Sequence, residues 1–84
     1  MPQVMQADGY SFRMYYKDHP PPHVHVWKSG DRCKIAIGTG EEPPYLLHPG
    51  DMRRTDAGRA LWMVNGCQEV LLAHWRRIRE RNSY

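Results

Sequence analysis

The sequence predicts one α+β domain in which a small antiparallel sheet of three or four strands packs on two C-terminal helices. Polar and apolar residues alternate in the first half of the chain, as in half-buried strands, and from about residue 55 the apolar residues recur every three or four positions, as in a helix. Strands at about residues 10–47 followed by helices at about residues 55–81 favour a layered fold. The chain has 84 residues, fewer than a typical domain of roughly 100–150, so residues 1–84 are expected to share one modest core.

Alternation of side chains defines the expected strands. It is clearest near the N-terminus, where Tyr10, Phe12 and Met14 occupy every second position. Farther along, Ser29-Gly30-Asp31 has the composition of a hairpin turn. The expected strands are residues 10–16, 23–28, 32–37 and, with a weaker pattern, 45–47.

A proline run separates the first two expected strands. Pro20, Pro21 and Pro22 lack backbone amide donors and favour polyproline II geometry, so they cannot lie inside a strand. We expect a stiff, extended connector with His19 at one end and His23 at the other. Asp18, next to His19, could orient that imidazole.

The helical period begins near residue 55, where Thr55 or Asp56 would serve as the N-cap. Asn65-Gly66 is expected to end this helix, and Asn65 with Gln68 resembles a variant capping box for a second one. The expected core combines one face of the helices with one face of the sheet. Its members are Leu61, Val64, Leu71, Trp75 and Ile78 from the helices, and Phe12, Met14, Val24, Val26, Ile35 and Ile37 from the strands.

Charge is distributed unevenly along a chain whose net charge is +3. Residues 1–52 carry five basic and six acidic side chains, whereas residues 53–84 carry seven basic and three acidic ones. The arginines of residues 76–81 could bind nucleic acid or an acidic protein, or could simply form a solvated helix face.

No segment resembles a signal peptide or a membrane span, so we expect a cytoplasmic location without a membrane partner. Cys33 and Cys67 are accordingly expected to be reduced thiols. A core this small is only marginally stabilising, which makes self-association into a homo-oligomer an open alternative.

The period of two predicts a functional face on the sheet. His23, His25 and Trp27 point to one side of their strand, and Val24 and Val26 point to the other. If the valines are buried, the open face also collects Arg13, Tyr15 and Lys34. Such a face suits a phosphate-bearing ligand, because cations attract the phosphate, an aromatic ring stacks a base and histidine transfers protons. The alternative is that it is merely the polar outer face that any small sheet needs.

Other chemistries have weaker signals. His19, His23 and His25 could ligate a metal, but extended prolines rising about 3.1 Å each would put His19 about 12 Å from His23. We therefore expect no metal and no cofactor. Neither cysteine belongs to a nucleophile motif, and His48 and His74 are expected to be structural.

The run from Asp18 to Val26, Asp-His-Pro-Pro-Pro-His-Val-His-Val, resembles the signature of a bacterial family, the domain of unknown function 4160. Tyr15 and Tyr16, the Lys34-Ile35 strand, and Asn65, Leu72 and Trp75 are also similar to that family. The resemblance spans roughly residues 10–78. The sequence departs from the family pattern in the loop at residues 38–50 and in the arginine-rich tail, residues 76–81.

The resemblance implies a role, because members of this family are often encoded beside a domain of unknown function 2442 protein, a pairing regarded as a toxin and its antitoxin. The leading hypothesis is a toxin-like component of a type II toxin–antitoxin pair that acts on RNA or translation. In that hypothesis the chain is a metal-independent ribonuclease, with His23 and His25 as acid and base. Arg13, Tyr15, His19, Trp27 and Lys34 would bind the ligand, and a small antitoxin would be the partner. The alternatives are a non-catalytic module that binds protein or nucleic acid, and a metal-dependent enzyme.

Overall fold

Two tight turns fold the N-terminal part of the chain into hairpins. Both residues of the Asp8-Gly9 turn have positive φ, 52° and 81°, and so do both residues of the Ser29-Gly30 turn, 51° and 86°. A two-residue hairpin loop of this kind requires positive φ at both positions, which glycine adopts without a steric penalty. The hairpin turn predicted at Ser29-Gly30 is therefore confirmed.

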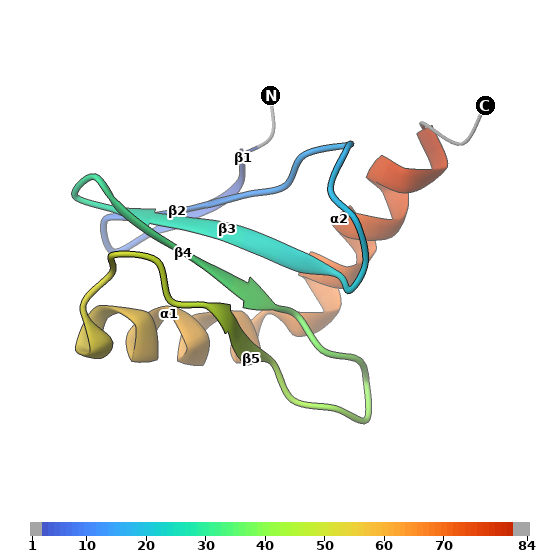
Figure 1. The fold of residues 1–84 in the computed structure, drawn as a ribbon. Coiled ribbons are helices and arrows are strands. Elements are labelled where there is room, and N and C mark those ends of the chain that lie inside the picture. Colours follow the sequence, from blue (N-terminus) through green and yellow to red (C-terminus); the bar gives the residue numbers. More distant parts are fainter. Residues whose placement is uncertain (1–2, 82–84) are drawn as a thin grey trace.

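The computed structural model describes residues 3–81 and has an α+β architecture (Figure 1). Each strand pairs antiparallel with its neighbour in sequence, in the order β1-β2-β3-β4-β5. Two helices follow the sheet. The elements are β1 (Gln3–Ala7), β2 (Tyr10–Arg13), β3 (His23–Lys28), β4 (Asp31–Ala36), β5 (Tyr45–His48), α1 (Arg54–Gly66) and α2 (Gln68–Arg81).

The prediction of three or four strands was too low, because the sheet formed by residues 3–81 has five. Strand β1 was missed, although the Asp8-Gly9 dipeptide that follows it is a strong hairpin signal. The first predicted strand was also too long, since β2 ends at Arg13 and not at residue 16. Beyond Arg13 the backbone turns, with the amide of Asp18 donating to the carbonyl of Tyr15 at 3.0 Å.

The core lies between one face of the sheet and the two helices (Figure 1). Every predicted strand residue of the core is at most 1% exposed, and Val64, Leu71 and Trp75 are buried with them. Leu61 and Ile78 pack against this cluster but are only partly buried. Tyr10, Met52 and Met63 are buried members that the expected core did not include, although Tyr10 belongs to the alternating pattern of its strand.

The helix boundaries differ from the expected caps. Helix α1 begins at Arg54 after an extended Arg53, whose side chain makes no capping hydrogen bond, so neither Thr55 nor Asp56 is the N-cap. Asn65 belongs to α1, and the break falls at Cys67, whose amide donates to the carbonyls of the preceding turn. The predicted capping box is therefore wrong. Gln68 instead donates its side-chain amide to the carbonyls of Ile37 and Glu42, at 2.9 and 2.8 Å.

The segment between β2 and β3 runs beside α2 (Figure 1). Arg79 of α2 donates a guanidinium hydrogen bond to the backbone carbonyl of Asp18 at 3.0 Å. The proline run bends at Pro20 and Pro21, with a cis peptide bond between them, so it is not the straight connector that was expected. Within residues 3–81, neither helix combines the length and the apolar character needed to span a membrane.

Candidate functional site

Strand pairing places a row of basic and imidazole side chains across the open face of the sheet. His25 of β3 pairs with Arg13 of β2 on one side and with Lys34 of β4 on the other. Lys34 in turn pairs with His48 of β5. Residues directly opposite one another in antiparallel strands point to the same face. Since Val24 and Val26 are fully buried on the opposite face, this row faces away from the helices.

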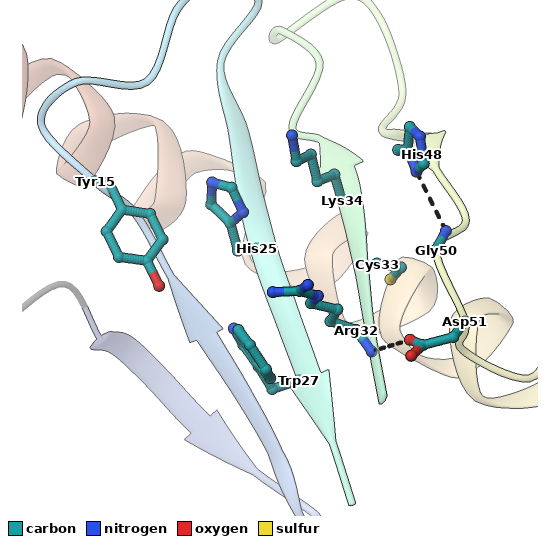
Figure 2. Close-up of a pocket in the computed structure, with 9 residues that line it drawn as sticks. All are labelled: Tyr15, His25, Trp27, Arg32, Cys33, Lys34, His48, Gly50 and Asp51. Carbon is teal, nitrogen blue, oxygen red and sulfur yellow. Dashed lines mark hydrogen bonds between the residues drawn. The ribbon is translucent and has the colours of Figure 1, made fainter. Parts of the chain in front are cut away.

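A cavity of about 670 Å³ lies over this row (Figure 2). Figure 2 shows His25 and Trp27 rising from β3, Arg32 and Lys34 from β4, and Tyr15 and His48 at the sides. The carboxylate of Asp51 accepts a hydrogen bond from the Arg32 amide at 2.8 Å, which ties the segment after β5 to β4. The cavity is therefore lined by cationic, aromatic and imidazole groups.

Trp27 holds two of the cations in place. The guanidinium carbons of Arg13 and Arg32 each lie 5.1 Å from the Trp27 ring centroid, within range of a cation–π interaction. The Trp27 ring therefore contacts two guanidinium groups. Guanidinium planes can themselves stack on nucleobases. The indole Nε1 of Trp27 is buried and has no hydrogen-bond partner within the part of the chain that the structure describes.

His25 has an acidic partner that the sequence did not reveal. Both carboxylate oxygens of Asp18 lie 3.1 Å from His25 Nε2. The Tyr15 amide donates to Asp18 Oδ2, also at 3.1 Å, and the Tyr15 ring meets the His25 ring edge-on with centroids 4.8 Å apart. The turn thus fixes a carboxylate against His25, so the expectation that Asp18 orients His19 was wrong.

Burial and charge act in opposite directions on His25. Burial lowers the pKa of His25 below its ordinary 6.5, and the hydrogen bond with Asp18 raises it without cancelling that effect. Nearby Lys34 lowers the pKa further. His25 is therefore a neutral imidazole at pH 7, with its Nε2 hydrogen pointing to the carboxylate.

His23 lies beneath the open face and not on it. Its side chain is buried, with ring centroids 5.5 Å from Trp75 and 5.2 Å from His25. Its Nδ1 is 2.8 Å from the Pro21 carbonyl oxygen, which can only accept, so Nδ1 carries a hydrogen. Its Nε2 faces Asp18 Oδ2 at 3.6 Å. The strand period placed His23 and His25 on one side correctly, but α2 and the turn at Asp18 cover the start of β3.

The structure thus brings together five of the predicted residues, Arg13, Tyr15, His25, Trp27 and Lys34. His19 is exposed and lines a separate cavity of about 280 Å³, which Lys34 also reaches. Arg32 was missed as a site residue, Asp18 was expected to act on His19 and not on His25, and His48 was expected to be structural. Arg32 had a signal, since it shares the strand face of Lys34, whereas Asp18 reaches His25 only through a turn.

Three donors could hold a metal ion. Asp18, His23 and His25 each offer one ligand atom, and these atoms all lie within 4.8 Å of one another. Two imidazole nitrogens and one carboxylate oxygen suit zinc or another divalent transition metal.

Comparison with known proteins identifies the family. A family model described as Domain of unknown function (DUF4160) matches residues 9–76. The chain belongs to the DUF4160 family. The DUF4160 match covers β2 to most of α2, and with them the open face and the Asp18–His23–His25 cluster. Comparisons with curated proteins and with solved structures gave no match.

Proposed function

We propose that this chain is the toxin-like component of a type II toxin–antitoxin pair and that the open face of its sheet binds single-stranded RNA in the cytoplasm. The toxin context comes from the family resemblance. The observation that supports RNA as the ligand is the group of cations beside Trp27 on the open face: Arg13 and Arg32 lie over its ring, and Lys34 lines the same cavity as Trp27 and Arg32. Cations interleaved with aromatic rings are the usual means of holding a nucleic-acid strand whose bases are unpaired.

The spacing of the cations suits a phosphodiester. Arg13 and Lys34 lie one strand to either side of His25, so their backbones are about 10 Å apart, twice the usual distance between strands. The Arg13 guanidinium is turned toward Trp27, whereas Lys34 is close enough to His25 to lower its pKa, so a phosphate bound by Lys34 would lie beside the His25 ring. His25 is accordingly the residue proposed to meet the reacting phosphate. His23 is the weaker candidate of the predicted pair, because its Nδ1 is bonded to Pro21 and its Nε2 faces Asp18.

Binding of a fluorescein-labelled single-stranded RNA, followed by fluorescence anisotropy, tests the proposed ligand. The double variant Arg32→Gln/Lys34→Gln should weaken binding at least about tenfold, and the slope of log K against log salt should shrink by about 1.4 for two lost phosphate contacts. Arg76→Gln/Arg77→Gln removes the same charge from exposed positions on α2 and is the matched control. If the α2 control loses affinity while the Arg32/Lys34 variant keeps it, RNA binds the helix and the proposal fails.

Inducible expression in a bacterial host tests the toxin context. Growth arrest that is relieved by the neighbouring gene product, and by Arg32→Gln/Lys34→Gln, would support both parts of the proposal. Normal growth of cells that accumulate folded wild-type protein would contradict the toxin role while leaving RNA binding to be judged by anisotropy.

A second candidate, a protein-binding module, is favoured by the β5 edge of the sheet. Tyr45, Leu46 and Leu47 are 50, 39 and 37% exposed, and β5 pairs only with β4 among the described strands. An exposed edge strand can accept a strand from a partner, such as a small antitoxin. Tyr45→Lys/Leu47→Lys should abolish such pairing and leave RNA affinity unchanged. Retained partner binding in this variant would exclude the β5 edge.

A further inference from the structure

We propose that Asp18, His23 and His25 form a binding site for one divalent transition-metal ion, most suitably zinc. This inference goes beyond the proposed RNA-binding role and does not depend on it. The expectation of no metal rested on the distance between His19 and His23. The structure offers Asp18 in the place of His19, because the turn after β2 returns the chain toward β3.

The distances between the donors are close to those around a zinc ion. Bonds of about 2.0–2.2 Å to nitrogen and oxygen at tetrahedral angles separate neighbouring ligand atoms by about 3.4 Å. Oδ2 of Asp18 lies 3.1 Å from His25 Nε2 and 3.6 Å from His23 Nε2. The greatest separation among the three ligand atoms is within 4.8 Å. Closure of the set around an ion would need small side-chain shifts, and the His25 hydrogen would move from Nε2 to Nδ1 so that Nε2 can bind the ion.

The orientation of the His23 ring suits a metal ligand. Because Nδ1 donates to the Pro21 carbonyl, Nε2 is the ring nitrogen that faces the Asp18 carboxylate, at 3.6 Å from Oδ2. An ion at this point would therefore contact His23 through Nε2 and Asp18 through the facing oxygen. A metal-bound histidine commonly donates its other ring hydrogen to a backbone carbonyl in this way, which fixes its tautomer.

The surrounding contacts hold the three side chains in place before any ion binds. The Tyr15 amide bonds the Asp18 carboxylate, and Arg79 bonds the Asp18 backbone carbonyl. The His23 ring packs between His25 and Trp75. Little conformational freedom remains to be lost on binding, which favours affinity.

The position of Lys34 indicates what an ion here would contact. Lys34 lines both the cavity over His25 and the one beside Asp18 and His23. Three protein ligands leave a tetrahedral ion with one open position, as in catalytic zinc sites. The positive charge of Lys34 would weaken binding of the cation, but it would also favour an anionic fourth ligand, such as a phosphate oxygen, in either cavity.

Metal titration of the full chain tests the site. The protein is purified without an affinity tag, freed of metal with a chelator and kept without RNA. Isothermal titration with zinc should show one ion per chain, and cobalt should give the visible absorption of a tetrahedral centre. Asp18→Asn and His25→Gln should each weaken zinc binding at least about tenfold. His19→Gln and His48→Gln are matched controls for the loss of an imidazole and should bind as wild type does.

His23→Gln should also lose the ion, and its melting curve shows whether it folds. If it does not fold, Asp18→Asn and His25→Gln decide the question, because both groups are less buried. The inference is overturned if wild-type protein binds zinc more weakly than about 1 mM, or if either control loses as much affinity as the ligand variants. Because no RNA is present, failure here leaves the proposed RNA surface to be judged separately by anisotropy.

Discussion

Asp18 and His25, seven residues apart in sequence, form a carboxylate–imidazole pair in which both Asp18 oxygens lie 3.1 Å from His25 Nε2. The pair connects the turn after β2 to the middle of β3. Arg79 reaches the same turn from α2, through the Asp18 carbonyl. A single residue thus joins the open face of the sheet to the helical layer, and a change at Asp18 should affect both stability and the site.

We predict that Asp18→Ala lowers the free energy of unfolding by about 1–3 kcal/mol, because it removes the acceptor of the Tyr15 amide and of His25. Urea denaturation in the presence of a chelator measures the loss. A double-mutant cycle with His25→Gln should give a coupling of at least about 0.5 kcal/mol, since the two residues are in contact. Additive effects of the two substitutions would mean that the pair does not stabilise the fold.

Trp75 should be essential for stability. It is 6% exposed and packs against His23 while Arg79 lies over its ring. Trp75→Ala is expected to cost about 3–5 kcal/mol, a large part of the stability of a small protein. Trp62→Ala is the matched control, because Trp62 is 69% exposed and should change stability by less than about 0.5 kcal/mol. Equal melting temperatures for Trp75→Ala and wild type would refute this account of the core.

The two cysteines should differ in reactivity. Burial raises the pKa of the Cys33 thiol to about 11, and its Sγ lies 3.6 Å from Met52 Sδ. At pH 8 only about 0.1% of Cys33 would be thiolate, the reactive form, and the fraction would rise only as the pH approaches 11. Cys67 is less buried. Ellman's reagent should therefore react with native protein in a fast phase, from Cys67, and a slow phase, from Cys33. The variant Cys67→Ser should lose the fast phase and keep the slow one. Equal rates for both thiols would contradict the burial of Cys33.

Gly50 should resist substitution. Its φ is +57°, and a Cβ at this position would overlap the carbonyl oxygen of Arg32. Gly50→Ala should destabilise the protein by about 1–3 kcal/mol and disturb the β4 side of the cavity. Gly40→Ala is the control, because a Cβ there meets no atom within 4 Å. Identical melting temperatures for the two variants would show that the close approach of Gly50 to Arg32 is relaxed in solution.

Local periodicity was enough to assign the faces of the strands and of the helices. The period of two separated Val24 and Val26 from His25 and Trp27, and the same rule placed Lys34 of the next strand on the face of His25. Both predictions succeeded because alternation is a local property of an extended backbone. Strand β1 could also have been predicted from the Asp8-Gly9 turn that follows it, because a type I′ turn is encoded by the two residues that form it.

Which of these side chains meet, and which are covered, depends on contacts between distant segments of the chain. Asp18 reaches His25 because the chain reverses at residues 15–18, and no local pattern specifies where that reversal points. His23 shares a strand face with His25, yet it is buried because Trp75, more than 50 residues later, packs on it. Periodicity fixes the direction of a side chain relative to its own backbone. The partner and the solvent exposure of that side chain depend on distant segments, which pack according to the shape and energy of the whole chain.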